Sequence, residues 1–424
     1  MALSKFITTK RLMVFALACE TLSATYMLNF PSLISFATIL YALAGITIAI
    51  TFLLLPEFQT ISFHPQYINH TRPLYWYKKA IIVVLGIVAI RFSVQWMEDA
   101  PMDYHDADML PIMKIMCQRF LSGKGGHVYD IIPEIWHGIQ PVYFPAMWMP
   151  YCIAVFHNFD LRWITVTAIF SSVILFFALL RPMKHQILTL IASLFMFITL
   201  WWILSSEASG IIPYTEEGII IFYYSLLALA LFTDSFIFLG VAISLCVLSR
   251  YALAGWLPAM LVYWIWTKQY KGLLKIVITG LSLLVLLMLL PFGIGVFQRL
   301  FFLPGEYIDF ARRVWNDSPH LFNITLGFAK FFGKEGILLQ HKLLLISALG
   351  LPTIFMTIGL YYHKTNKNIT LKHLPIAILK IGLVIFYCMI DVPYLYLFYT
   401  SLFFSFIVVV MSLRIENQAV GERK

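Results

Sequence analysis

Charged side chains are scarce in this sequence. Asp, Glu, Lys and Arg make up 12% of the 424 residues, whereas hydrophobic residues make up 61%. A soluble globule needs more polar surface than this composition can supply, so a soluble enzyme is excluded and a polytopic membrane protein is indicated. The apolar runs are mostly about 18 to 23 residues long and do not alternate with polar residues, so we expect membrane-spanning helices rather than a β-barrel.

Cysteine is also rare, and its placement excludes two classes of stabilising site. Of the five cysteines, Cys19, Cys246 and Cys388 fall inside apolar runs, and the spacing fits neither a disulfide framework nor a zinc site. The net charge of +9 could attract nucleic acid. However, the Lys and Arg residues sit in short loops and at the ends of apolar runs, as membrane topology requires, so we expect no nucleic-acid partner.

No polar stretch is long enough to form a separate soluble domain. We therefore expect residues 1–424 to form one all-α polytopic membrane domain with about twelve transmembrane helices and additional juxtamembrane helices. The expected spans are 12–30, 33–55, 80–97, 161–180, 187–204, 219–233, 236–250, 251–267, 274–297, 339–361, 374–390 and 394–412.

One further apolar piece, residues 142–157, is short and is interrupted by Pro145 and Pro150. Positive charge gathers on the cytoplasmic side of membrane proteins. If residues 142–157 do not fully cross, the basic clusters within 72–79, 181–184, 268–275, 364–372 and 414–424 all fall on that side. We therefore expect this piece to be a juxtamembrane or re-entrant helix.

This topology leaves most carboxylates on the non-cytoplasmic side, in an outer loop at 98–145, a second outer loop at 298–338, and the short segment 205–218. Arg250, Arg299, Arg312 and Arg313 are the main counter-charges there. A charge at the bilayer centre costs at least about 2.5 to 3.5 kcal/mol, so such groups gather where water or a partner is available. We expect them to meet in one polar cavity.

Asp106 and Asp108 stand at the start of an amphipathic segment in the first outer loop. Apolar residues recur at helical spacing from 107 to 121, and the glycines that follow, beginning with Gly123, are typical of a helix C-terminus. We expect a helix on the membrane surface with its apolar face toward lipid.

The two aspartates have two interpretations. Asp106 could cap the helix while Asp108 complements its dipole. Alternatively, the pair could deprotonate an acceptor hydroxyl or bind a divalent cation such as Mg²⁺ or Mn²⁺, since hard cations prefer carboxylate oxygens. An isolated Asp-x-Asp is a weak signal, but its position directly after a membrane helix is more specific. No cofactor is required by the sequence, and the cation remains an option.

These features resemble the first outer loop of the GT-C integral-membrane glycosyltransferases, especially the bacterial group that uses polyprenyl-phosphate mannose. The matching positions are Asp106 and Asp108, Gly123, Tyr129-Asp130, and the Tyr143-Phe-Pro145 step. Residues 239–258 also resemble the family's helix with a basic residue before a proline-marked run. The chain departs from the family in its extra N-terminal hairpin and in carrying Arg250 where relatives often have lysine.

The resemblance implies an inverting transfer of a sugar, mannose or another hexose or pentose, from a polyprenyl-phosphate donor to a lipid-linked, glycan or protein acceptor. A carboxylate base, Asp106 or Asp108, would act on the acceptor. Arg250 with Arg312 or Arg313 would hold the departing phosphate, since guanidinium groups match phosphate oxygens. Arg250 could instead be a snorkelling helix-end residue, and the other two arginines could pair with Glu306, Asp309 or Asp317.

Substrate-binding roles are assigned to five further residues, Tyr129, Tyr143, Glu217, Tyr251 and Asn323. Tyrosines near the membrane surface are also common as interfacial anchors. Glu217, with Glu207 and Glu216, could be a solvated loop charge, and Asn323 could simply form a turn.

Other classes of membrane protein would also have about twelve spans. A transporter or flippase of a lipid-linked sugar should show internal repeats and charged pairs near the middle of its spans, which the sequence does not reveal. A surface-glycan polymerase or ligase usually carries its large loop late in the chain, whereas the most acidic loop here comes early. We therefore expect a glycosyltransferase of a bacterial inner membrane, surrounded by lipid, with its active site facing the periplasm or exterior.

Overall fold

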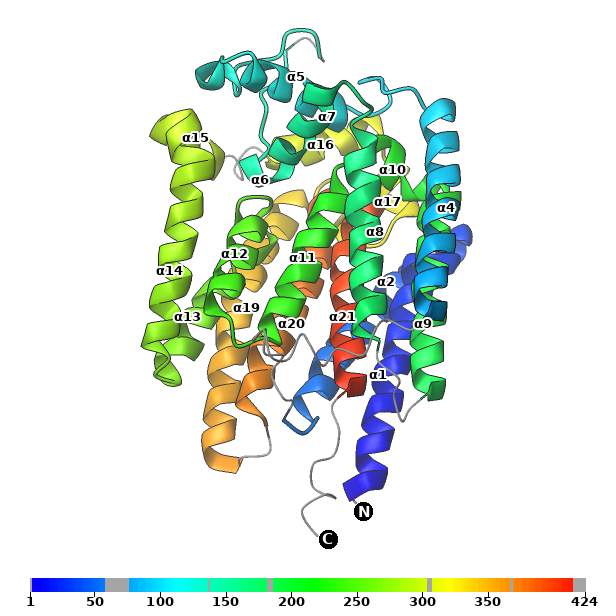
Figure 1. The fold of residues 1–424 in the computed structure, drawn as a ribbon, viewed down its shortest axis with the longest axis vertical. Helices are drawn as coiled ribbons and strands as arrows, with labels where there is room; N and C mark the ends of the chain where they lie inside the picture. The colour runs from blue at the N-terminus through cyan, green and yellow to red at the C-terminus, as the bar shows by residue number, and fades with distance from the viewer. Residues whose placement is uncertain are drawn as a thin grey trace.

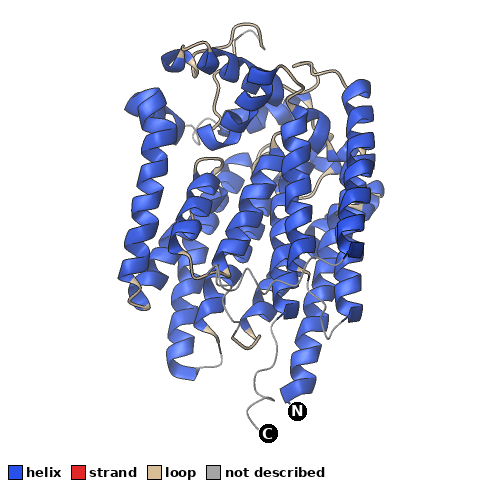
Figure 2. Cartoon of the chain, viewed as in Figure 1, coloured by secondary structure: helices blue, strands red, loops and turns tan. Residues whose placement is uncertain are grey.

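The chain folds into a bundle of α-helices (Figure 1; Figure 2). The structure is a computed structural model, and it describes residues 2–57, 76–135, 138–180, 186–302, 307–366 and 369–414. Within those ranges there is no β-strand, and Ile132 and Ile139 form an isolated antiparallel bridge. The expectation of an all-α polytopic protein is therefore confirmed.

The first half of the bundle contains five long helices and several short ones at one end. The long helices are α1 (Ala2–Ala24), α2 (Ile34–Leu53), α4 (Trp76–Asp99), α8 (Arg162–Leu179) and α9 (Gln186–Ser205). Between α4 and α8 lie α5 (Met109–Leu121), α6 (Pro145–Trp148), η4 (Met149–Tyr151) and α7 (Cys152–His157).

The second half begins with three short apolar helices, α11 (Glu217–Leu231), α12 (Phe236–Val247) and α13 (Trp256–Trp266), with α10 (Ile211–Tyr214) just before them. The helices that follow are α14 (Tyr270–Leu284), a π-helical turn η7 (Val285–Leu289), α15 (Leu290–Phe302), α16 (Tyr307–Asp317), α17 (Leu321–Ile324), α18 (Ala329–Phe332), α19 (Ile337–Asn366), α20 (Leu374–Met389) and α21 (Phe398–Arg414).

Nine helical segments in the described part of the chain are long and apolar enough to cross a membrane by length and composition. They match nine of the expected spans, from α1 to α21. The other three expected spans form the shorter apolar helices α11, α12 and α13. The count of twelve crossings therefore stays a prediction.

Residues 142–157 do not form a single spanning helix. They fold into three consecutive short pieces, α6, η4 and α7, of which the longest, α7, has six residues. Pro145 and Pro150 each stand in the first turn of a piece, where a missing backbone N–H is tolerated. The segment lies at the same end of the bundle as α5 (Figure 1).

Helix α21 forms the centre of the bundle. Its most apolar stretch is 100% buried, whereas that of α4 is only 11% buried. It contacts α1, α8, α9, α11 and α20. Small and hydroxyl residues such as Ser401 and Ser405 line it, and they allow close approach between helices without leaving polar atoms unpaired. Ser405, for example, donates to the carbonyl of Ser401 at 3.2 Å.

The N-terminal hairpin, α1 and α2, packs directly on this centre. The Tyr41 hydroxyl of α2 donates to the Phe398 carbonyl at 2.7 Å, and the Tyr399 hydroxyl donates to the Ala24 carbonyl at 3.1 Å. Gly45 permits the contact between α2 and α20, because a Cβ at this position would lie 2.5 Å from a methyl group of Val384.

The two ends of the bundle differ in charge. The start of α14, the end of α19 and the end of α21 carry Lys271, Lys364 and Arg414, and lie at the same end of the bundle as the start of α1 (Figure 1). The opposite end, which we call the loop end, carries α5, α6, α7, α10 and α16, and with them the acidic residues of 98–145 and 205–217. This asymmetry is typical of a membrane protein with its basic end in the cytoplasm. Residues 181–184 and 415–424 lie outside the described residues, as does Arg72, whereas Lys78 and Lys79 belong to the first turn of α4.

A buried ion pair joins α1 to α20 at about the middle of both spans, and it was not anticipated from the sequence. Lys380 Nζ lies 2.5 Å from Glu20 Oε1 and also donates to Ser401 Oγ of α21 at 2.7 Å. Both charged side chains are at most 1% exposed. A charge inside a span is tolerated when it is paired, so this contact ties the hairpin to the core of the bundle.

We expect Lys380→Met to destabilise the bundle by about 3 to 5 kcal/mol, because it leaves a buried carboxyl group without its partner. The double variant Glu20→Gln with Lys380→Met removes both charges and should be closer to the wild type. Thermal unfolding in detergent measures the effect, with the exposed Lys271→Met as the matched control. Equal stability of Lys380→Met and Lys271→Met would contradict a role for the pair.

Candidate functional site

Helix α5 lies across the loop end of the bundle (Figure 1). Its apolar residues Leu110, Met113, Met116 and Cys117 are at most 1% exposed, because they pack on α6, η4 and α7. The expectation that this face would meet lipid is therefore wrong. The broken segment 142–157 provides a protein surface beneath α5, and that surface could not be inferred from the period of α5 alone.

The loop after α5 is fixed by glycine and arginine. Gly123 has a φ of 78°, a left-handed conformation that favours glycine and ends the helix as expected. Arg119, in the last turn of α5, donates to the carbonyls of Asp130 at 2.6 Å and Ile131 at 3.0 Å. These bonds hold the Tyr129-Asp130 step against the end of α5.

Tyr129 supports the site from beneath rather than facing solvent. Its side chain is 1% exposed, and its ring packs edge-on against Phe292. Its hydroxyl donates to the carbonyl of Tyr143 at 2.9 Å and accepts from the indole of Trp148 at 3.1 Å. Arg299 of α15 donates to the Tyr129 carbonyl at 3.2 Å. Tyr129 therefore positions the backbone of Tyr143.

Three charged residues form a buried ion-pair cluster at the loop end. Arg250, which follows α12, places one guanidinium nitrogen 2.6 Å from Glu217 Oε2 and another 3.1 Å from Glu216 Oε1. The arginine side chain is 12% exposed, and the glutamates are 2% or less exposed. A guanidinium group can bridge two carboxylates because its donors lie in a fixed plane. We call these three residues the Arg250 cluster.

The core helix α21 completes the cluster. Thr400, in its first turn, donates its hydroxyl to Glu217 Oε1. Glu217 is the first residue of α11, and its backbone N–H donates to the hydroxyl of Thr215 at 3.2 Å. A carboxylate in the first turn of a helix is stabilised by the helix dipole. The position of Glu217 is thus fixed from three sides.

Asp108 lies close enough to this cluster to act on it electrostatically. Burial raises the pKa of Glu216; Arg250 opposes that rise, and the charge of Asp108 adds to it. Burial also raises the pKa of the Tyr143 phenol, and Asp108 and Glu216 raise it further. Asp108 from the first outer loop and Arg250 from the end of α12 are therefore brought to one region of the loop end.

The positive charge of Arg250 is already neutralised. Two carboxylates accept from it, and a third, Asp108, acts on the same group of residues. One cation among three acids leaves an acidic region.

The remaining sequence-predicted residues lie apart from the cluster or serve other contacts. Tyr251 donates its hydroxyl to the Leu300 carbonyl and packs edge-on against Phe144. Asp106 is exposed, and Asn323 is exposed on α17. Arg312 is 53% exposed and pairs with Asp309 at 3.0 Å, one of the pairings anticipated for it. Arg313 is exposed on the same helix, and Glu306 lies outside the described residues.

The described part of the chain contains no group of three or more His, Cys, Asp or Glu side chains that could hold a metal ion. Close to Asp108 in the sequence, His105 is used locally. His105 Nδ1 lies 2.7 Å from Asp103 Oδ1, and hydrogen bonds from the backbone and ring of His105 lower the pKa of Asp103. Asp106 and Asp108 therefore gain no third ligand from these histidine and acidic residues.

Three residues of the site carry little signal in the sequence. Glu216 and Glu217 could equally be solvated loop charges, and only the apolar run that follows them hints at burial. Thr400 is one of many hydroxyl residues in apolar runs. Its role depends on a contact across 183 positions of the chain. Such contacts follow from helix packing, which local patterns do not specify.

No protein-family model, no curated protein and no solved structure matches this chain.

We expect protonated Glu216 to persist above pH 4.5, the ordinary value for glutamate, because burial and Asp108 both disfavour its charged form. The carboxyl band in the infrared difference between wild type and Glu216→Gln, followed against pH, measures this pKa. Asp108→Asn should lower the pKa of Glu216, since it removes a like charge. A Glu216 that titrates below pH 4.5, or that does not respond to Asp108→Asn, would contradict the arrangement.

Proposed function

We propose that this protein is an integral-membrane glycosyltransferase. It moves a sugar from a polyprenyl-phosphate donor to a hydroxyl group of an acceptor at the loop end of the bundle. The observation that carries the proposal is the meeting of Asp108, Tyr143 and the Arg250 cluster, which come from distant parts of an apolar chain. The resemblance of the first outer loop to GT-C glycosyltransferases supports the same reaction class.

Asp108 is the acid in this region that a substrate can reach. It is partly exposed, whereas Glu216 and Glu217 are buried and bonded to Arg250. A general base must come within hydrogen-bond distance of the proton it removes, so access selects Asp108 over Glu216 and Glu217.

In the proposed reaction, the acceptor oxygen attacks the anomeric carbon of the donor sugar from the side opposite the phosphate. The bond from the acceptor oxygen to hydrogen breaks, and the proton passes to Asp108. A new bond forms between that oxygen and the anomeric carbon with inversion. The bond from the anomeric carbon to the phosphate oxygen breaks, and polyprenyl phosphate leaves with the electron pair.

In this proposal Arg250 stabilises the two buried glutamates and also binds the departing phosphate. It holds Glu216 and Glu217 in a protein interior where neither could remain charged alone. Two of its five N–H groups suffice for these bonds, which leaves donors for a phosphate oxygen. Arg312 and Arg313 carry no part of the proposal, since Arg312 is used by Asp309 and both are exposed on α16.

We expect Asp108→Asn to reduce transfer by about 100-fold or more, because it removes the general base while preserving size. The measurement is the release of polyprenyl phosphate by the full chain in membranes, with polyprenyl-phosphate mannose, glucose and arabinose as donors. Asp317→Asn, on the exposed face of α16, is the matched control and should retain activity. Full activity of both Asp106→Asn and Asp108→Asn would remove these residues from the mechanism.

Arg250→Lys tests separately whether Arg250 binds the phosphate of the donor. Lysine keeps the charge but loses the planar fork, so the two glutamates remain partly compensated while a phosphate loses paired donors. We expect the KM for the donor to rise about tenfold, with a smaller change in the KM for the acceptor. A donor KM equal to that of the wild type would restrict Arg250 to holding the glutamates.

One observation favours a second function, a flippase or transporter of a lipid-linked sugar. Such proteins carry charged pairs near the middle of their spans, and Glu20 and Lys380 form such a pair. The two functions differ in chemistry. In proteoliposomes, a flippase moves the intact lipid-linked sugar across the bilayer, whereas a glycosyltransferase releases polyprenyl phosphate and a glycosylated acceptor.

A further inference from the structure

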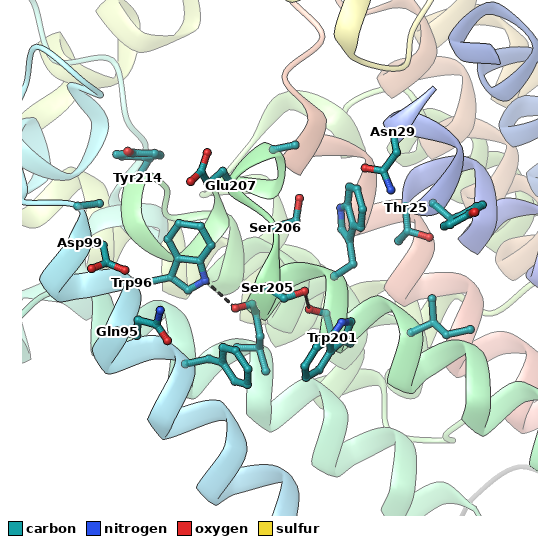
Figure 3. Close-up of a pocket in the computed structure, with 17 residues that line it drawn as sticks. Thr25, Asn29, Gln95, Trp96, Asp99, Trp201, Ser205, Ser206, Glu207 and Tyr214 are labelled. Atoms are coloured by element: carbon teal, nitrogen blue, oxygen red, sulfur yellow. Dashed lines mark hydrogen bonds between the residues drawn. The ribbon is translucent and has the colours of Figure 1, made fainter. Parts of the chain in front are cut away.

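A cavity of about 900 Å³ opens near the loop end, between the ends of α1, α4 and α9 (Figure 3). Gln95 and Asp99 of α4 stand on one side, and Thr25 and Asn29, which follow α1, stand on the other. None of its lining residues belongs to the Arg250 cluster. The volume lies within the range of ordinary ligand sites, about 300 to 1,000 Å³.

The aromatic content of this cavity is high. Its aromatic lining residues are Tyr26, Phe92, Trp96, Trp201, Trp202 and Tyr214. The plane of Trp96 is fixed, because its indole nitrogen donates to the Leu204 carbonyl at 2.6 Å (Figure 3). Trp201 is 58% exposed, so much of its surface remains uncovered by protein. Rigid aromatic faces of this kind pack against the apolar C–H face of a flat ligand.

The polar content excludes two other kinds of occupant. Asp99, Glu207, Gln95 and Asn29 all line the cavity, so an aliphatic chain would leave them without hydrogen-bond partners. Among the 17 described residues that line it, there is no lysine, arginine or histidine. Two carboxylates without a cation repel a phosphate or another anion. The cavity therefore suits a neutral ligand with many hydroxyl groups and an apolar face.

The cavity also adjoins the first outer loop. Tyr214 of α10 lines it, and burial raises the pKa of the Tyr214 phenol, with further increases from the charges of Asp106 and Glu207. Arg162, which lowers that pKa, donates to the carbonyls of Ala100 at the cavity and Met97 of α4. One wall of the cavity thus lies close to the loop that carries Asp108.

We propose that this cavity binds a neutral sugar unit of the acceptor. The inference that the sugar belongs to the acceptor rests on the proposed function. The inference that the ligand is a sugar rests on the cavity alone. Aromatic faces with carboxylate and amide groups satisfy a sugar ring, whose two faces are apolar and whose rim carries hydroxyl donors and acceptors. Carboxylates accept hydrogen bonds from hydroxyl donors more strongly than neutral groups do. The N-terminal hairpin, which the resembled family lacks, supplies Thr25, Tyr26 and Asn29 to this site.

The test is saturation-transfer NMR on the full chain in lipid nanodiscs, with the methyl glycosides of mannose, glucose and galactose as probes. Methyl phosphate and ethanolamine are the comparison solutes. We expect transfer to at least one glycoside and to neither comparison solute. We expect Glu207→Gln and Trp201→Ala to raise the Kd of that glycoside about tenfold or more. The matched controls are Glu335→Gln and Trp266→Ala, which change exposed residues outside the cavity.

Glu207 and Trp201 are both exposed, so their substitution should leave the bundle folded, and thermal unfolding checks this. A second arm adds a glycolipid with the same sugar to the nanodisc. If the glycolipid competes with the soluble glycoside, the natural ligand is a lipid-borne sugar. If it does not compete, the natural ligand is a soluble saccharide. Binding of none of the glycosides, preference for methyl phosphate or ethanolamine, or equal weakening by cavity and control variants would overturn the proposal.

The outcomes separate this inference from the proposed function. Sugar binding at the cavity without any release of polyprenyl phosphate would keep the sugar site and overturn the glycosyltransferase. Release of polyprenyl phosphate with cavity variants that change neither glycoside binding nor the acceptor KM would overturn the sugar site alone.

Discussion

The loop end of this bundle depends on one arginine shared between two buried glutamates. In an apolar interior a lone carboxylate loses more hydration energy than any single contact returns. Glu216 and Glu217 are consecutive, so both are forced into the interior when α11 packs on the core helix. Arg250 bonds both, and Thr400 satisfies the second oxygen of Glu217. Without that bridge, α11 could not begin where it does.

The same bridge decides how charge is distributed at the site. Because Arg250 serves two acids and lies near a third, the region retains negative character and favours a proton acceptor. The departing phosphate of a sugar donor must therefore approach the guanidinium group from the side that the glutamates leave open. The cavity lined by Asp99 and Glu207, which has no cation among its described lining residues, lies away from the Arg250 cluster, among α1, α4 and α9. The described residues of the proposed acceptor site therefore include no cation, whereas the proposed donor site contains Arg250.

The sequence allowed the helices to be predicted because apolar length is a local property. The ends of α5, α9 and α20 follow directly from where apolar residues stop. The partners of buried charges could not be predicted in this way. Lys380 and Glu20 are 360 positions apart, and Glu217 and Thr400 are 183 apart. In a hydropathy profile each of these residues is a small interruption in a long apolar run. The profile does not show which of these polar residues contact one another.

The expectation for α5 failed for a related reason. An apolar stripe shows that a helix face is covered, but it does not identify the cover. Charge placement predicts that residues 142–157 do not fully cross. A segment that does not cross must lie at the surface, where it can support α5, and this consequence does not follow from the sequence of α5 itself. The substrate-binding prediction for Tyr129 meets a similar limit, because the sequence does not show what its hydroxyl contacts. Its polar end is used within the protein, by Tyr143 and Trp148.

Three consecutive residues of α21 join the parts of the molecule that carry its charges. The hydroxyl of Tyr399 bonds the last residue of α1, directly before Thr25 on the cavity wall. Thr400 bonds Glu217, and Ser401 bonds Lys380. Successive residues of a helix point about 100° apart, so one turn of a fully buried helix can contact three neighbours at once. The cavity wall, the Arg250 cluster and the Glu20–Lys380 pair are therefore positioned by a single turn of one rigid element.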